Sequence, residues 1–430
     1  MFNTIFLELK SKMKHNIFLK NIVLLSSGTM LAQALGIVSL PIITRIYTPS
    51  EYGSLTLYTT LILIFSIGSF YLELAIPISS NKKEAKKMVQ ISFFVLLLYT
   101  FFLAICTILV PDKLKIQIYN HENFHFFFFL VIVGVFCTGF YSIARQWSLR
   151  EQDYSALSKA SIIQSINGNF SKIFLGTVGL NTFGLVIGNI ISVSSGSFKL
   201  LKSFFKADIY IVNYHDFFSL LKRYKDFPLY QTPSMLLTRL GQQSPIIFLT
   251  SFYGVEIAGL YGLASSIIML PMILIGDSIS DVYYSEAAKI VKKDPYKLKE
   301  LSTNLFRKTF LFALPISLFF LVFSPIFFSI VFGEKWTESG DFARMLSLYL
   351  FCRMVFAPVG KICVILEKQR QIMIINILTT IVAILMFYIS FKLSVDAQTS
   401  ILFYSLVMSS SFFITFIYGF KLINYKTKDK

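Results

Sequence analysis

The sequence predicts an all-α membrane protein with about twelve transmembrane helices. Its 430 residues are 55% hydrophobic and only 15% charged, whereas soluble domains carry about a quarter charged residues. The apolar residues form long blocks, and a helix needs roughly 20 such residues to cross the hydrocarbon core. Lipid offers no partners to backbone N–H and C=O groups, so blocks of this length form helices. This composition excludes an ordinary soluble enzyme.

Twelve apolar segments are the predicted spans. They cover residues 21–44, 54–79, 88–110, 124–144, 157–178, 180–200, 227–252, 257–284, 308–332, 342–366, 371–391 and 399–420. The fifth and sixth spans are the least apolar, because they are rich in Ser, Gly and Asn.

The 40 lysines and arginines lie mainly on one side of the predicted membrane. They gather before the first span, after the even-numbered spans and in the tail. Positively charged loops stay in the cytoplasm, so we expect both termini there. The net charge of +17 then reflects membrane topology, and no nucleic-acid partner is expected. Trp147 and Trp336 follow the fourth and ninth spans, where we expect membrane interfaces.

An internal repeat relates the two halves. Residues 30–36 and 46–53 are similar to residues 235–241 and 251–261, with Glu51 and Glu256 at the same offset. Chance similarity between apolar segments is the alternative explanation. Six spans per half is an even number, so the halves would share one orientation, as in transporters built from parallel repeats.

The repeat predicts two six-helix lobes around a central cavity. The N-terminal lobe would comprise residues 1–201 and the C-terminal lobe residues 227–430. A basic cytoplasmic linker, residues 202–226, would join them.

Polar and charged side chains within spans are costly in lipid, so they line cavities or pair with one another. Arg239 and Arg353 lie near the middle of their spans. An arginine can hold a diphosphate through two parallel hydrogen bonds. The other candidates for substrate contact are Lys172, Lys361, Arg45 and Gln33. The alternative for the charged candidates is a structural ion pair, or a side chain that reaches to the membrane interface.

Three acidic residues could couple transport to H⁺ or Na⁺. Glu73 lies in the second span, and Asp277 and Asp281 lie in the eighth. Because the two aspartates are four residues apart, they share one helix face. A structural role at a helix end is the alternative for them. No cofactor is expected.

One enzymatic pattern is present. His121, Glu122 and His125 fit H-E-x-x-H, a zinc-binding motif of metalloproteases. The motif lies at the outer end of the fourth span, and the other downstream histidine, His215, is on the cytoplasmic side. We therefore predict two interfacial histidines and no metal site, with a metalloprotease as the minor alternative. The four cysteines fall inside apolar blocks and are predicted core residues.

The sequence also resembles a known family. Residues 28–53 and 71–77 resemble the opening of bacterial polysaccharide-export flippases, the O-antigen and capsule family. Residues 242–246, 258–261 and 275–288 agree in the second half. The resemblance implies the fold of the multidrug, oligosaccharidyl-lipid and polysaccharide exporters, whose two six-helix lobes rock between inward-open and outward-open states.

The resemblance implies a function as well. The substrate would be a polyprenyl-diphosphate-linked oligosaccharide, moved from the cytoplasmic to the periplasmic leaflet of the bacterial inner membrane for O-antigen, capsule or lipopolysaccharide synthesis. The protein would be a transporter rather than an enzyme. Its partners would be membrane lipid and, in the same pathway, a glycan polymerase and a chain-length regulator. Family members depend on cationic cavity residues, which Arg239 and Arg353 suit by position.

Two other functions fit the same pattern. One is an ion-coupled exporter of drugs or other small molecules with the same fold. The other is a membrane-embedded glycan polymerase, which needs a substantial periplasmic loop that carries catalytic residues. The predicted outside loops are too short for that role.

Overall fold

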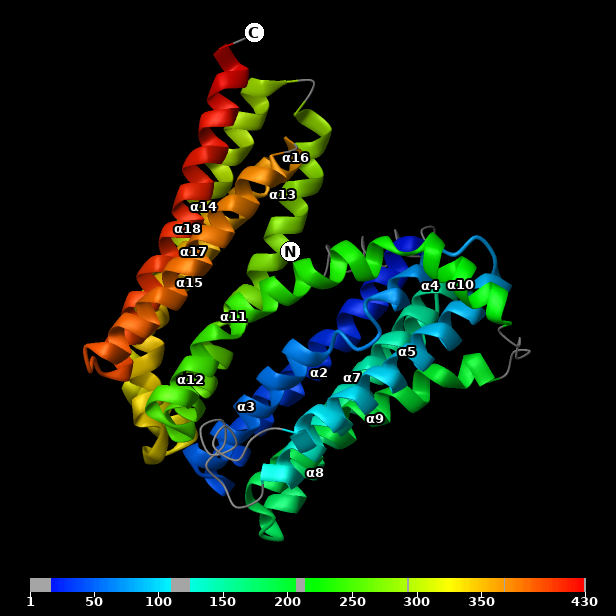
Figure 1. The fold of residues 1–430 in the computed structure, drawn as a ribbon. Helices are drawn as coiled ribbons and strands as arrows, with labels where there is room; N and C mark the ends of the chain where they lie inside the picture. The colour runs from blue at the N-terminus through cyan, green and yellow to red at the C-terminus, as the bar shows by residue number, and fades with distance from the viewer. Residues whose placement is uncertain (1–16, 110–123, 206–212, 292–293, 367, 429–430) are drawn as a thin grey trace. The chain divides into compact units, whose positions relative to one another are not determined.

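The computed structural model describes residues 17–109, 124–205, 213–291, 294–366 and 368–428, and these residues contain helices and no β-strand (Figure 1). The first half contains α2 (Ile17–Ile46), α3 (Pro49–Phe65), η1 (Leu72–Leu74), α4 (Ala75–Ile78), α5 (Lys82–Leu109), α7 (Phe124–Arg150), α8 (Tyr154–Thr177), α9 (Asn181–Phe205) and α10 (Tyr214–Arg223).

The second half continues with helices of similar length. They are η2 (Phe227–Gln231), α11 (Thr232–Tyr253), α12 (Val255–Ile268), η3 (Met272–Gly276), α13 (Asp277–Ile290), α14 (Pro295–Phe332), η4 (Glu334–Trp336), α15 (Thr337–Gly360), α16 (Ile362–Ile365), α17 (Gln369–Lys392) and α18 (Ala397–Lys428). The all-helical fold predicted from the sequence is confirmed. Among the described residues, nine helices are long and apolar enough to cross a membrane, and the count of twelve crossings stays a prediction.

The chain divides into two compact units. The first comprises Met1–Tyr47 and Leu57–Gln243, and the second comprises Thr48–Thr56 and Ser244–Lys430. Helices α3 and α11 therefore contribute residues to both units. The predicted lobes, 1–201 and 227–430 with a linker at 202–226, stay a prediction. Part of that linker is helix α10.

Close packing of α8 against α9 explains why the fifth and sixth predicted spans are poor in large apolar residues. Small side chains spaced four apart on α9 face α8: Gly184, Gly188, Ser192 and Gly196. A Cβ atom on Gly188 would lie 2.6 Å from Cγ of Lys172 and 2.9 Å from its backbone nitrogen. Small residues let helix backbones approach this closely in membranes.

The second predicted span, residues 54–79, is not one continuous helix. Helix α3 ends at Phe65, and the chain then turns before η1 and α4. Phe70 and Tyr71 adopt left-handed backbone conformations with φ of 49° and 56°. Arg150 of α7 stabilises the far side of this break, because its Nη1 donates to the carbonyls of Ile76, Pro77 and Ser79 at 2.9–3.1 Å.

The second unit includes a tight crossing between the first turns of α3 and α12. A Cβ atom on Gly259 would lie 2.1 Å from the carbonyl oxygen of Pro49. Thr48 and Glu51 form a capping box at the start of α3: the Glu51 carboxylate accepts from the Thr48 N–H at 2.7 Å, and the Thr48 hydroxyl accepts from the Glu51 N–H at 3.3 Å.

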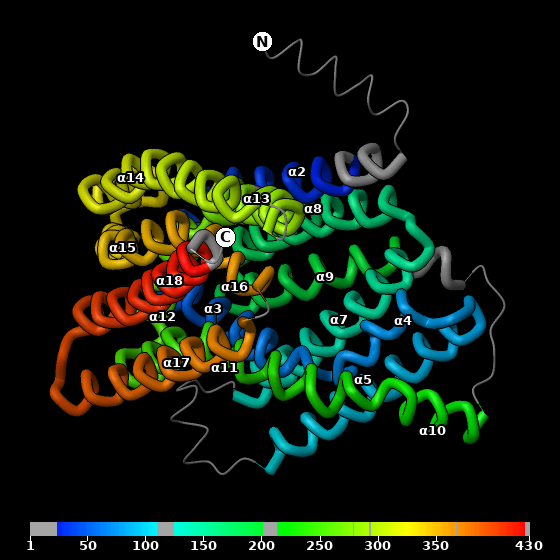
Figure 2. Tube along the Cα trace, turned by 90° about the horizontal axis from the view of Figure 1, so that it is seen from above, coloured from blue at the N-terminus to red at the C-terminus, as the bar shows by residue number. Residues whose placement is uncertain are grey.

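The larger part of the second unit is a layer of long helices. Helices α14, α15, α18 and α17 lie next to one another in that order (Figure 2). Trp336 is fully buried in this unit, with its ring 5.5 Å from that of Tyr52. Trp147 is fully buried in the first unit. Both tryptophans, which the sequence predicts at membrane interfaces, are thus enclosed by protein.

The α8–α9 packing predicts opposite effects for two glycine substitutions. Gly188→Ala forces the two helices apart and should lower stability by roughly 1–3 kcal/mol, as overpacking does. Gly36→Ala on α2 is the matched control, since nothing lies within 4 Å of its Cβ position and alanine favours helix by roughly 1 kcal/mol. Thermal unfolding in mild detergent should show a lower Tm for Gly188→Ala alone. Equal Tm values for the two variants would contradict this packing.

Candidate functional site

In the first unit, Arg239 of α11 contacts the broken end of α3. Its Nη1 donates to the carbonyl oxygen of Leu63 and to the hydroxyl of Ser66. The guanidinium carbon also lies 5.9 Å from the ring centroid of Tyr71. A cation at a helix C-terminus is favoured by the helix dipole and satisfies a free carbonyl. Arg239 therefore stabilises the break in this structure.

Glu73 is buried beside this arginine. Its side chain is 4% exposed, and its carboxylate accepts hydrogen bonds from the hydroxyl of Ser69 and, at 3.1 Å, from that of Ser142 on α7. The charge of Arg239 also acts on this carboxylate. The structure thus brings together two residues that the sequence suggested separately. Ser142 was not predicted, because only the packing of α7 against the break places it there.

In the second unit, Arg353 of α15 is partly buried among aromatic side chains. Its Nη1 lies 3.2 Å from the hydroxyl of Tyr349 and 3.4 Å from the sulfur of Met269. The ring of Tyr404 lies 6.5 Å from that of Tyr349. No carboxylate of the described chain pairs with Arg353, and its Nε and Nη2 donors form no hydrogen bond there. The i−4 spacing of Tyr349 could have revealed this neighbour from the sequence.

Two other candidates pair with each other. Nζ of Lys361 lies 3.2 Å from a carboxylate oxygen of Asp281 on α13; the Asp281 side chain is 76% exposed and that of Lys361 is 41% exposed. Exposed ion pairs contribute little stability, about 0–1 kcal/mol. Asp277 is also exposed, four residues before Asp281. These three residues therefore form a solvent-accessible group rather than a buried one.

The remaining candidates lie apart from these clusters in the first unit. Lys172 is partly buried on α8 over Gly188, and its carbonyl accepts from the hydroxyl of Tyr47 at 2.7 Å. Arg45 is exposed in the last turn of α2, and Gln33 is exposed on the same helix. Lys172 has no ion-pair partner among the residues that the structure describes.

The zinc motif is only partly described. His121 and Glu122 lie outside the described residues, and His125 is exposed in the first turn of α7. Within the described ranges, no group of three or more metal-ligating side chains occurs. All four cysteines are free, with Cys352 and Cys363 buried.

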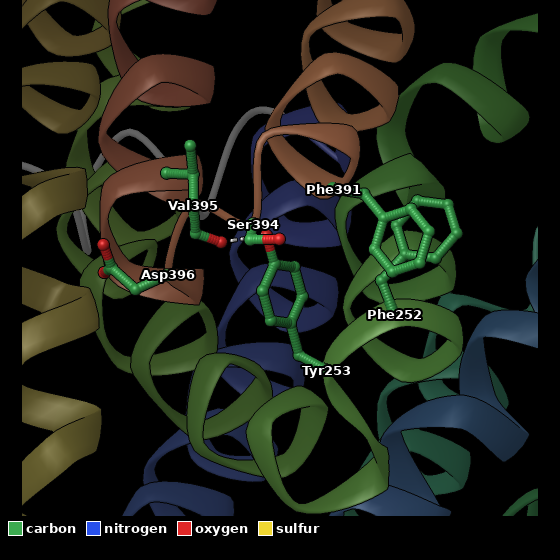
Figure 3. Close-up of a pocket in the computed structure, with 6 residues that line it drawn as sticks. All are labelled: Phe252, Tyr253, Phe391, Ser394, Val395 and Asp396. Carbon is green, nitrogen blue, oxygen red and sulfur yellow. Dashed lines mark hydrogen bonds between the residues drawn. The ribbon is translucent and has the colours of Figure 1, made fainter.

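A cavity of about 310 Å³ lies where the end of α11 meets the turn between α17 and α18 (Figure 3). It is lined by Phe252, Tyr253, Phe391, Ser394, Val395 and Asp396. The Tyr253 hydroxyl donates to the carbonyl of Val395 at 2.7 Å, and the rings of Phe252 and Phe391 stack 4.1 Å apart. No cationic candidate lines this cavity, so it is unsuited to a diphosphate.

Residues 42–341 match the model of a family described as polysaccharide biosynthesis protein. The chain belongs to this family. Two curated relatives are similar over shorter stretches. The chain is 29% identical over 150 residues to the teichuronic acid biosynthesis protein TuaB of Bacillus subtilis. It is 26% identical over 178 residues to the lipopolysaccharide biosynthesis protein WzxC of Escherichia coli.

These alignments cover 35% and 41% of this family member, and only 30% and 36% of the relatives. The chain thus spans about a third of the length of the curated relatives that it matches. The resemblance to polysaccharide exporters that the sequence predicts is confirmed at the level of the family.

Solved structures share the fold over nearly the whole chain. The lipid II flippase MurJ in an inward closed conformation matches with a TM-score of 0.71, covering 94% of this chain and 87% of MurJ. An inward-facing MATE multidrug resistance transporter of the MOP superfamily matches with a TM-score of 0.65, covering 94% and 99%. Sequence identity is 16% in both cases. The family member therefore has the two-lobe helical fold of a multi-pass membrane protein.

The carboxylate of Asp396, which lines the cavity, caps the start of α18, and its contribution to stability should depend on pH. The Thr399 N–H donates to its carboxylate at 2.9 Å at the start of α18 and holds the pKa of Asp396 below its usual value. This stabilisation is present above the pKa of the unfolded chain and is lost as pH falls through the lowered pKa. Asp396→Ala should therefore cost about 1 kcal/mol at neutral pH and almost nothing in strong acid.

Thermal unfolding in detergent at neutral and acidic pH measures this difference. Asp277→Ala is the control, because that exposed carboxylate accepts no hydrogen bond in the described chain. A difference in Tm between Asp396→Ala and the unaltered protein that did not change with pH would contradict the capping role.

Proposed function

We propose that this chain is a flippase for polyprenyl-diphosphate-linked oligosaccharide, moving it from the cytoplasmic to the periplasmic leaflet of the bacterial inner membrane by alternating access. Membership of a polysaccharide biosynthesis family supports this function. So do relatives named for teichuronic acid and lipopolysaccharide biosynthesis, and a fold shared with a lipid II flippase. Each of these favours a transporter over an enzyme.

The observation that carries the proposal is that Arg353 has no carboxylate partner among the residues that the structure describes. A cation in low-dielectric surroundings is costly unless a counter-charge approaches it. The hydrogen-bond partners of Arg353 in the described chain are a neutral hydroxyl and a thioether. A diphosphate would supply the missing negative charge and accept hydrogen bonds from the unused donors of the guanidinium.

The same contacts allow release. Met269 and Tyr349 compete weakly for the guanidinium, so a substrate displaces them at small cost and they return when it leaves. Lys361 differs, because the carboxylate of Asp281 already neutralises it and would repel a diphosphate. Arg353 is therefore the stronger candidate for the substrate anion.

Transport of such a molecule needs a polar path. A diphosphate with its sugars cannot enter hydrocarbon without losing its hydrogen bonds to water, which costs many kcal/mol. A route lined by hydroxyls and arginines replaces those bonds, while the prenyl chain stays in lipid. A glycan polymerase and a chain-length regulator would then act on the delivered units as partners.

The buried Glu73 is the best placed of the acidic candidates for H⁺ coupling. Two serine hydroxyls surround its carboxylate, and a hydroxyl can donate to the ionised form or accept from the protonated form. Asp277 and Asp281 are exposed, so the protein does not enclose their carboxylates as it encloses that of Glu73. The charge distribution of the loops supports cytoplasmic termini.

Replacing Arg353 tests the flippase. Arg353→Gln should reduce surface polysaccharide by about tenfold or more, since hydrogen bonds to charged groups are worth about 1.5–3 kcal/mol. The lipid-linked precursor should accumulate in the cytoplasmic leaflet at normal protein level. Arg353→Lys should restore only part of the export, because an ammonium group cannot form the two-pronged contact.

Lys361→Gln is the matched control and should leave the surface polymer near normal. If deletion of the whole gene altered drug tolerance while the glycan stayed normal, the protein would be a drug exporter instead. Normal polymer in Arg353→Gln would remove this arginine from the mechanism.

Replacing Glu73 tests the coupling. Glu73→Gln keeps hydrogen-bonding groups beside Ser69 and Ser142 but cannot release a proton. In reconstituted vesicles, an imposed pH gradient should accelerate translocation by the unaltered protein and by Asp277→Asn, but not by Glu73→Gln. A response lost in Asp277→Asn and kept in Glu73→Gln would assign coupling to the exposed aspartate.

A further inference from the structure

Helix α10 is fixed to the start of α5 by polar contacts. Lys87 forms an ion pair with Asp216, and Arg223 pairs with Glu84 at 3.1 Å. The Tyr224 hydroxyl also donates to Glu84 at 2.7 Å. The Lys87 ammonium holds the pKa of the Asp216 carboxyl below its usual value. These contacts determine which side of α10 faces outward.

The inner side of α10 is apolar and packed. Leu220 and Tyr224 are buried in a cluster with residues of α4, α5 and α7, and Phe217 packs against it. On the neighbouring side of the helix, Tyr214 is 81% exposed and Phe218 is 51% exposed. The two exposed rings lie 4.6 Å apart.

Two lysines continue this exposed side. Lys222 lies one turn after Phe218, and Lys225 is the second residue after the end of the helix. Both are exposed and form no ion pair within the described residues. We call Tyr214, Phe218, Lys222 and Lys225 the outer stripe of α10. Aromatic rings next to lysines on one helix face are typical of segments that lie in the membrane interface.

The outer stripe is continuous with an apolar face of α5. Phe94 is 50% exposed on that face, and its ring lies 6.0 Å from that of Phe217, which in turn lies 5.4 Å from the ring of Phe218 in the stripe. Further along α5, the exposed side chains are Leu97, Leu98, Phe101, Phe102, Ile105, Ile108 and Leu109. A helix face of this composition faces lipid tails. Helix α10 packs at the start of α5, next to the beginning of this apolar face.

We propose that the outer stripe of α10 binds the anionic phospholipid headgroups of the cytoplasmic leaflet. The aromatic rings insert among the headgroups and the lysines pair with phosphates, so the surface takes a lipid bilayer rather than a soluble protein. Charge complementarity supports this occupant, because cytoplasmic leaflets are anionic and attract exposed lysines. The inference does not depend on which substrate the protein transports.

Hydrogen–deuterium exchange of the full chain in nanodiscs tests the proposal. We expect amides of residues 214–223 to exchange several-fold more slowly in phosphatidylcholine mixed with phosphatidylglycerol than in phosphatidylcholine alone. High salt should remove the difference by screening. Lys222→Gln/Lys225→Gln should weaken the response on the order of tenfold, given the contribution of each lysine near an anionic surface.

Lys297→Gln/Lys299→Gln is the matched control. It removes two exposed lysines at the start of α14 and should leave the exchange of α10 unchanged. Equal exchange of the unaltered protein in the two lipids at low salt would overturn the proposal. Protection of α10 that required an added soluble protein instead of anionic lipid would overturn it as well.

Discussion

Polar groups that a helix releases inside a membrane must find partners within the protein, because lipid provides none. The break after α3 shows how this constraint organises the first unit. Arg239 caps the Leu63 carbonyl, and Arg150 donates to the carbonyls at the end of α4. Glu73 is held by hydroxyls from two segments. A broken helix at this depth is tolerated only with such a set of partners.

Arg239 and Arg353, the two arginines predicted from the sequence, differ in how their hydrogen-bond donors are satisfied. Arg239 uses its donors on backbone and hydroxyl groups of its own unit, so its charge helps to hold the fold. Within the described residues, Arg353 donates only to a hydroxyl and a thioether and keeps other donors unused. Two residues of the same type therefore differ in the number of hydrogen-bond donors that they leave for a ligand. The second unit offers the better anion site.

Much of the fold follows from apolar block length, since each predicted range is mostly helical. The break at residues 66–71 could not be predicted, because Phe70 and Tyr71 are ordinary span residues that rarely adopt positive φ. From the sequence, α8 and α9 are the least apolar of the predicted spans. The structure shows that their small residues let the two helices pack closely. For the site, sequence position found Arg353 and Glu73, but their neighbours Met269 and Ser142 come from helices distant in the chain.

The first turns of α3 belong to the second unit, packed through Gly53 and Gly259 against α12. The ribosome completes these turns long before it makes their neighbours. The first turns of α3 therefore lack their packing partners until α12 has been synthesised. The C-terminal half expressed alone would lack the residues that pack against Gly259, so the second unit depends on a segment from the N-terminal half of the chain.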